Sequence, residues 1–208
     1  MRDGTLTVID AIFDSNQAAL LGPDTGGGAI YVQGSKHGIL IVHSTFTNNH
    51  AANGGAVGSL FSELDVYDSV FTGNVATGNG ANNNDPSKCS AMNNGQNEIG
   101  SGGNGGALYN DGGMFKAGMG SGNGTNNLIF CGDDIENNAA DPTGFGGGIF
   151  FTSNDYSGTL KITDSKIEGN TGGHWTNVKS GSVTNAGTAV GTNAKSITIT
   201  GSMVQGVP

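Results

Sequence analysis

Charged residues, prolines and cysteines are all scarce in this sequence. Only 12% of the 208 residues are charged, four are proline and two are cysteine. Glu, Lys and Arg are good helix formers, so their scarcity argues against long helices. No apolar run approaches ~18 residues, which leaves no candidate for a membrane-spanning helix. The composition favours an all-β chain, and the length favours a single domain over residues 1–208.

Basic residues are especially few, and this limits the classes of partner. The formal net charge is −9 and the sequence pI is near 4.5. A nucleic-acid-binding protein needs a basic stripe that faces the phosphates. We therefore expect no nucleic-acid partner. Anionic membranes and polyanionic substrates are also disfavoured unless a divalent cation bridges the charges.

Glycine and asparagine are abundant, and they fall at fixed places in a six-fold repeat. Counting from the first apolar residue of each copy as position +0, apolar residues recur at +0, +2 and +7. Asparagine follows at +10 in five copies. Positions +0 and +2 share one face of a strand because side chains alternate along it. Self-similarity of this kind predicts a solenoid. The copies begin at Leu6, Ile39, Leu64, Leu128, Leu160 and Ile197.

A third strand is predicted after most copies, at segments that read Gly-Gly-Ala and then an apolar residue. The apolar residue is Ile30, Val57 or Leu108, and a Gly-Gly-Gly variant precedes Ile149. Three strands and three turns per repeat make one coil of a parallel β-helix, so about six coils are expected. The long step between the third and fourth copies predicts a loop insertion at about residues 77–103. Asparagines at +10, stacked about 4.8 Å apart, are expected to form a hydrogen-bonded ladder.

Two motifs carry a resemblance to known families. Phe13-Asp14-Ser15-Asn16, Phe46-Thr47-Asn48-Asn49 and Phe71-Thr72-Gly73-Asn74 are FxxN motifs, and they alternate with the Gly-Gly-Ala segments. Together they resemble the repeats of chlamydial polymorphic outer-membrane proteins, and the wider right-handed β-helix proteins of the pectin-lyase-like superfamily. The resemblance implies a right-handed parallel β-helix in a bacterial protein that is secreted or displayed at the cell surface. It implies either an adhesin-like protein or a polysaccharide lyase or hydrolase, and fold alone does not choose between them.

Positions +4 and +5 form a turn with a column of polar residues. Asp10, His43, Asp68, Asp133 and Asp164 come from successive copies and are expected at one corner of the β-helix. Carboxylates about 5 Å apart repel, so a proton or a cation is favoured there. Oxygen-rich stacks suit Ca²⁺, which makes the four aspartates candidate calcium ligands. His43 between two aspartates has the makings of an acid–base group. The alternative is that Asp and Ser cap the turns through local backbone hydrogen bonds.

An enzymatic site is the alternative function. Asp133 and Asp134, with Gly172-Gly173-His174 further on, resemble the paired-aspartate and Gly-His motifs of polygalacturonase-type hydrolases, in which two carboxylates flank a water. The set is incomplete, because no upstream Asn-Thr-Asp and no downstream Arg-x-Lys accompany it. If the protein is an enzyme, the catalytic candidates are His43, Asp68, Asp133 and Asp134.

An aromatic column suggests ligand binding. Tyr31, Tyr109 and Phe150 each follow an apolar residue that is expected to point inward. They should therefore point outward, as a flat strip that stacks on sugar rings. The alternative is packing beneath the long insertion. Our leading prediction is an extracellular, adhesin-like β-helix scaffold that contacts a polysaccharide, a cell-surface glycan or another surface, with no cofactor unless Ca²⁺ binds at the corner.

Two further predictions concern the cysteines and the ends of the β-helix. A Cys89–Cys131 disulfide would close a loop of ~40 residues and stabilise by a few kcal/mol, if the geometry permits. It would favour an extracellular or periplasmic location, whereas the alternative is two unrelated thiols. Coils without capping helices leave strand edges unpaired, which predicts either capping coils outside the given sequence or end-to-end self-association.

Overall fold

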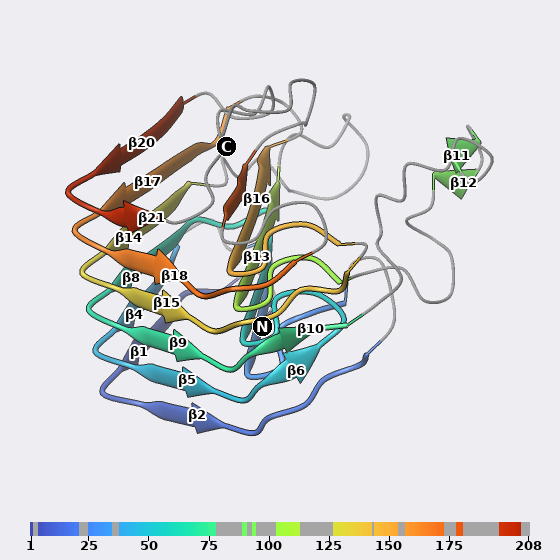
Figure 1. Ribbon diagram of the computed structural model, residues 1–208, viewed down its shortest axis with the longest axis horizontal. Helices are drawn as coiled ribbons and strands as arrows, with labels where there is room; N and C mark the ends of the chain where they lie inside the picture. The colour runs from blue at the N-terminus through green and yellow to red at the C-terminus, as the bar shows by residue number, and fades with distance from the viewer. Residues whose placement is uncertain are drawn as a thin grey trace.

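The computed structural model describes residues 1, 4–20, 25–34, 38–77, 89–90, 93–94, 103–112, 127–142, 144–153, 157–172, 178–180 and 196–204. All regular structure in these segments is β-strand (Figure 1). Most of the strands stack in three parallel sheets, and two short pairs lie outside them. Among the described residues there is no helix that is long and apolar enough to cross a membrane.

Each of the three sheets takes one strand from each of five or six successive coils. The first sheet contains β1 (Leu6–Ile9), β4 (Ile39–Val42), β8 (Leu64–Tyr67), β14 (Leu128–Cys131), β17 (Thr159–Thr163) and β20 (Ser196–Thr200). The second contains β2 (Ile12–Asp14), β5 (Thr45–Thr47), β9 (Val70–Thr72), β15 (Asp134–Glu136), β18 (Lys166–Glu168) and β21 (Met203–Val204). The third contains β3 (Ile30–Gln33), β7 (Val57–Leu60), β13 (Leu108–Gly112), β16 (Ile149–Ser153) and β19 (Val178–Ser180).

The register between coils is the one that the repeat predicts. In the first sheet the six +0 residues align from Leu6 to Ile197, and in the second the +7 residues align from Phe13 to Val204. The predicted all-β fold, a parallel β-helix, is confirmed. Of the predicted insertion at residues 77–103, the structure describes the ends and a short antiparallel pair, β11 (Cys89–Ser90) with β12 (Asn93–Asn94). The rest of the insertion lies outside the described residues.

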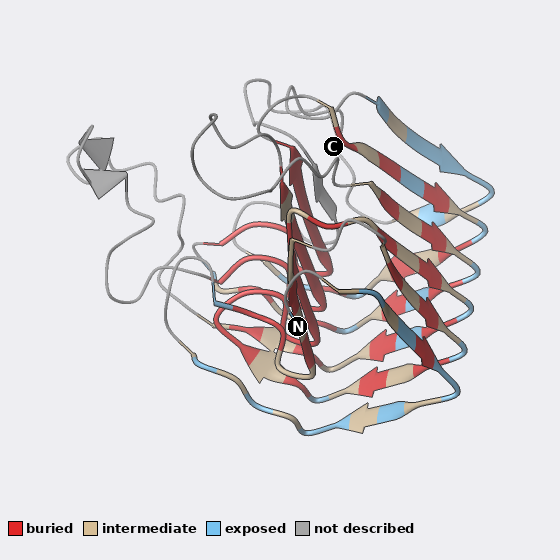
Figure 2. Cartoon of the chain, turned by 180° about the vertical axis from the view of Figure 1, so that it is seen from behind, coloured by how far each residue is buried: buried red, intermediate tan, exposed pale blue. Residues whose placement is uncertain are grey.

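The core runs along the axis of the β-helix and is built from the +0, +2 and +7 side chains. Phe13, Phe46 and Phe71 stack with ring centroids 4.8 and 4.7 Å apart. This spacing equals the distance between neighbouring strands, so identical rings can stack without distorting the coils. Figure 2 shows the buried residues as continuous columns in the middle coils, with exposed residues along the first and last coils and at the turns between them.

The asparagines at +10 form the predicted ladder. The amide nitrogen of each of Asn16, Asn49, Asn74 and Asn138 donates to the side-chain oxygen of the next asparagine along the axis, at 2.9 Å in every case. The backbone N–H of the same residue donates to the same oxygen. The ladder ends at Asn170 in the fifth coil. It fixes the turn after each strand of the second sheet, and a short pair, β6 (His50–Ala51) with β10 (Val75–Ala76), follows this turn.

The Gly-Gly-Ala segments keep the third turn free of side chains. A β-carbon added to Gly55 would collide with the backbone carbonyl oxygen of Gly106 in the next coil. Only glycine therefore lets the coils approach this closely. The third sheet that follows is buried on both faces: every residue of β7 and β16 is buried.

Candidate functional site

The turn between the first and second sheets is the place where the sequence predicts chemistry. One residue of each coil, at +4, has a left-handed backbone there, with φ between 47° and 77°. These six residues are Asp10, His43, Asp68, Gly132, Asp164 and Gly201. Asp, His and Gly tolerate this conformation better than most residues do. The turn reverses the direction of the side chains, so +4 residues point outward and +5 residues point inward.

The predicted single corner column is therefore two columns with opposite environments. The non-glycine +4 residues are exposed. At +5, Ser44, Ser69 and Ser165 are buried, and Asp133 is 0% exposed. The prediction placed Asp133 beside Asp10, Asp68 and Asp164. This is wrong, because Asp133 is at +5 whereas the other three aspartates are at +4. A shift of one residue moves a side chain from solvent to the interior.

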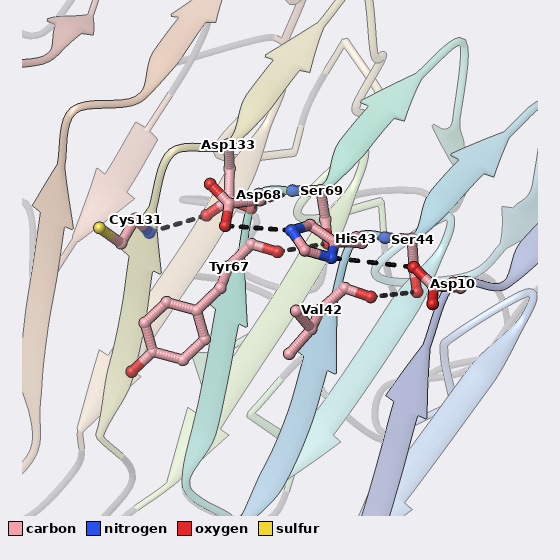
Figure 3. Close-up of polar contacts among 9 residues, drawn as sticks. All are labelled: Asp10, Val42, His43, Ser44, Tyr67, Asp68, Ser69, Cys131 and Asp133. Atoms are coloured by element: carbon pink, nitrogen blue, oxygen red, sulfur yellow. Dashed lines mark hydrogen bonds and ion pairs between the residues drawn. The ribbon is translucent and has the colours of Figure 1, made fainter.

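The outer column places His43 between two aspartates. Its Nδ1 atom lies 3.8 Å from an Asp10 oxygen, and its Nε2 atom lies 3.4 Å from an Asp68 oxygen (Figure 3). More than half of each of the three side chains is exposed. Water screens such pairs, so their contribution to stability is small. The column continues through Gly132, where the Asp68 carboxylate occupies the space that a β-carbon would need.

The inner column is a continuous hydrogen-bonded ladder. The backbone N–H of each +5 residue donates to the +5 side chain of the next coil, from Ala11 to Ser202, over distances of 2.8 to 3.2 Å. The serine hydroxyls donate in turn to the carbonyl oxygen two residues earlier. The structure thus contains the alternative that we predicted for these polar residues: the serines cap the turns through hydrogen bonds to nearby backbone groups.

Asp133 is the one carboxyl group in this inner column. Its Oδ1 atom accepts from the backbone N–H of Ser69 at 2.8 Å, and its Oδ2 atom accepts from that of Cys131 at 2.8 Å. Burial raises the pKa of Asp133 to about 7. The two N–H donors act against this rise, whereas the charges of Asp68 and Asp134 add to it.

This geometry does not assemble the predicted catalytic pair. Asp133 and Asp134 are successive residues entering β15, and they point to opposite sides of the backbone: Asp133 is buried and Asp134 is exposed. They therefore do not flank a common water, as the paired-aspartate chemistry requires. His174 lies outside the described residues. The catalytic roles of His43, Asp68, Asp133 and Asp134 stay predictions without geometric support.

The predicted calcium ligands do not converge either. Asp10 and Asp68 are separated by His43, Asp164 is separated from Asp68 by Gly132, and Asp133 faces the interior. Within the segments that the structure describes, no three His, Cys, Asp or Glu side chains come together in a way that could hold a metal ion.

The aromatic column faces outward, but two of its three rings are buried. Tyr109 and Phe150 stack at 5.1 Å and are only 5% and 3% exposed. With Leu60 and Phe145 they form a second apolar cluster, separate from the axial core, against which Tyr31 and Phe61 pack. Of the predicted sugar-binding strip, Tyr109 and Phe150 are therefore covered, and Tyr31 is half-buried. The alternation is right, but a second apolar layer covers the outer face of the third sheet.

The predicted disulfide is not present in the structure. Cys131 is a free, half-buried thiol at the end of β14. The side chain of Cys89 lies outside the described residues.

A surface that the sequence analysis missed lies on the outside of the first sheet. Its outward positions are +1 and +3. Position +3 is apolar or aromatic in four consecutive coils and +1 is apolar in two of them, and none of these six side chains is fully buried. We call this surface the outer apolar face; it consists of Ile9, Leu40, Val42, Tyr67, Ile129 and Cys131. The sequence could have revealed this face, because the outward side of a solvated sheet normally carries polar residues, and apolar residues at these positions depart from that pattern.

A carboxylate and a phenol mark the centre of the outer apolar face. Asp65 lies between Leu40 and Ile129 in the +1 column. Partial burial raises its pKa, and the charge of Glu63 adds to the effect. Partial burial also raises the pKa of Tyr67, and the negative charge of Asp65 raises it further. The phenol of Tyr67 therefore stays protonated near neutral pH and can donate a hydrogen bond.

The stacked sheets and the ladders at the turns define this chain as a parallel β-helix repeat protein. The family described as Chlamydia polymorphic membrane protein (Chlamydia_PMP) repeat matches residues 10–33 and 43–59. These ranges hold the first two FxxN motifs and the first two Gly-Gly-Ala segments. No curated protein and no solved structure matches the chain. The chlamydial part of the resemblance is thus supported over the first two coils, and the link to the pectin-lyase-like superfamily is not.

Proposed function

We propose that this protein is an adhesin-like β-helix, displayed at the outer membrane or cell surface of a bacterium, that binds a glycan without transforming it. The outer apolar face is the proposed contact surface. The observation that carries the proposal is that this face presents six apolar or aromatic side chains in two adjacent columns without burying them fully. Contiguous apolar patches on a soluble surface are typical of binding sites.

The chemistry of the face favours a sugar ring as its occupant. The aromatic ring of Tyr67 can stack on the apolar side of a pyranose, as aromatic side chains do on flat apolar groups. Asp65 and the Tyr67 phenol lie in neighbouring columns and can accept and donate hydrogen bonds to sugar hydroxyls. The match to a polymorphic membrane protein repeat supports display at the surface.

The ladders beneath the face support a scaffold role. The backbone of β4, β8 and β14 is held by the in-register sheet and by the inner serine column at its end. A binding surface is more effective when its side chains stand on rigid elements. No specific contact among the described residues favours the enzymatic alternative.

Glycan binding can be tested by substitution of Tyr67. Replacing Tyr67 by alanine removes the stacking ring, and we expect binding on a glycan array to weaken roughly tenfold. Thr72→Ala is the matched control, because Thr72 is a half-buried residue of the same coil that lies on the second sheet. The control should bind as the wild type does.

Two results would contradict the proposal. If no glycan is retained but a surface protein is, the occupant is a protein and the glycan assignment is wrong. If a glycan is retained equally by both variants, the contact surface is elsewhere. Antibody labelling of intact and permeabilised source cells tests the location: labelling only after permeabilisation would exclude surface display.

A further inference from the structure

Three outward side chains of the third coil lie in one row on the outside of the first sheet. Glu63 immediately precedes β8, and Asp65 and Tyr67 lie on this strand. Alternate residues along a strand share one face and are about 7 Å apart. All three side chains are half-buried, whereas Leu64 and Val66 between them are fully buried. The row therefore places two carboxyl groups beside an aromatic ring at the surface.

Asp65 has apolar neighbours and no positively charged partner among the described residues. Leu40 and Ile129 pair with it in the flanking strands. No described residue donates a hydrogen bond to its carboxylate, and the charge of Glu63, which acts on it, has the same sign. Lys161 lies in the same column, but two coils away, with Ile129 between them. A half-buried carboxylate in this position is stabilised by a cation that comes from outside the chain.

Glu63 is oriented by a chain of hydrogen bonds that runs along the axis. One of its carboxylate oxygens accepts from the side-chain amide of Asn127 at 3.0 Å. The oxygen of that amide accepts from the backbone N–H of Thr159 at 3.2 Å and from its hydroxyl at 2.8 Å. In the preceding coil, the neighbour of Glu63 is Gly38, which has no side chain to cover it. The second carboxylate of the row is thus held at the surface.

The two carboxylates distinguish between classes of sugar. A uronic acid would bring a third negative charge to the row and would be repelled. A neutral sugar gains stacking and neutral hydrogen bonds only. A hexosamine with a free amino group is positively charged when protonated, and its hydrogen bonds to a carboxylate are roughly twice as strong as neutral ones. The net charge of −9 also attracts such a cation over a longer range.

We propose that the outer apolar face prefers glycans that carry free amino groups, and that Asp65 sets this preference. The preference rests on the proposed function, because it takes Tyr67 as the ring on which the sugar stacks. An amino group at the edge of that sugar can point along β8 toward Asp65, about 7 Å from Tyr67. The ammonium group then pairs with Asp65, and Glu63 adds a second negative charge at the far end of the row. The aromatic face of Tyr67 also attracts a cation.

The experiment compares the wild type with Asp65→Asn on matched pairs of glycans, oligomers of glucosamine and of galactosamine with their amines either free or fully N-acetylated. Binding is measured at about pH 6, where the carboxylates are ionised and the free amines are protonated. The wild type should bind the free-amine member of a pair more tightly. In Asp65→Asn the ratio of the two affinities should fall about tenfold. Asp134→Asn removes the same charge from an exposed position on the second sheet, and this control should keep the wild-type ratio.

A measurement on the wild type alone replaces the comparison if Asp65→Asn does not fold. Added sodium chloride should weaken binding of the free-amine glycan and leave that of the N-acetylated glycan unchanged, because salt screens the charge pair. An equal response of both glycans to salt would overturn the preference.

The outcomes separate this preference from glycan binding itself. If the wild type retains glycans without favouring the free-amine forms, or if Asp65→Asn keeps the wild-type ratio, the preference is overturned and the proposed function stands. If no glycan is retained, or if Tyr67→Ala binds as the wild type does, the proposed function fails and the preference fails with it. Retention of polylysine in place of every glycan would assign the row to a basic polypeptide and would also overturn the preference.

Discussion

At the scale of single residues, the asparagine at +10 shows how one side chain closes a turn and joins two coils. Asn74 is fully buried, and its oxygen accepts from both the backbone and the side chain of Asn49. Its amide donates to the Phe46 carbonyl and to Asn138. Each of these groups would otherwise be buried without a partner, which is expensive inside a protein.

Alanine at position 74 should therefore destabilise the protein far more than alanine at position 16. Asn16 is half-buried at the beginning of the ladder and donates to Asn49. We expect Asn74→Ala to lower the free energy of unfolding by about 3 kcal/mol and Asn16→Ala by about 1 kcal/mol. Urea unfolding measures both. Equal losses would mean that the ladder oxygens contribute little beyond the packing of the side chain.

At the scale of the structural element, the left-handed turn at +4 decides which side chains reach solvent. Gly132 has φ = +77°, and the Asp68 carboxylate lies where its β-carbon would be. An aspartate in one coil is thus paired with a glycine in the next. The same pairing recurs between Asp164 and Gly201. In this turn, the glycine of one coil leaves space for the aspartate side chain of the coil before it.

Gly132→Ala tests this pairing. The added β-carbon would be strained by the positive φ and would displace the Asp68 side chain, so we expect a loss of about 2 kcal/mol. Asp68→Gly should relieve the displacement but not the strain. A double-mutant cycle should therefore show favourable coupling between the two changes. Additive losses in thermal unfolding would show that Asp68 moves away without cost.

At the scale of the whole molecule, the coils support one another only through their neighbours. The end strands β1 and β20 of the first sheet, and β2 and β21 of the second, pair on one side only. Among the residues that the structure describes, the exposed large apolar residues other than Met1 and Val70 lie on these end strands: Ile9, Ile12, Ile199 and Met203. Unpaired strand edges with apolar side chains favour pairing with another chain. End-to-end association therefore stays a prediction.

Ile12→Lys tests association at the first coil. Ile12 is 78% exposed on β2, and a lysine on an edge strand opposes pairing with another chain. Light scattering should show that the wild type associates as its concentration rises and that the variant does so less. Val70→Lys is the control, because Val70 occupies the same +6 position on the central strand β9. A wild type that stays monomeric at every concentration would rule out this association.

The repeat alone determined the fold, the register between coils, and two columns of side chains: the stacked rings at +7 and the asparagine ladder at +10. Apolar side chains at +0, +2 and +7 can be buried only if successive coils align, and asparagine at +10 satisfies its hydrogen bonds only in a stack. These requirements are local and periodic, so they can be read from the spacing of residues such as Phe46 and Asn74. The positions of the turns were also readable, because glycine and aspartate occur where the backbone is left-handed.

The direction of each side chain at a turn, and what covers each outer face, were decided only by the tertiary structure. The left-handed residue at +4 reverses the alternation, so Asp133 is buried while Asp68 is exposed, although both belong to one polar segment of the repeat. Tyr109 faces outward but is buried because a second apolar cluster covers it, and Tyr67 is only half-buried because nothing comparable covers its sheet among the described residues. Periodicity specifies contacts between equivalent residues of neighbouring coils. It carries no information about contacts between non-equivalent residues, and these determine which carboxyl group is buried and which surface stays accessible.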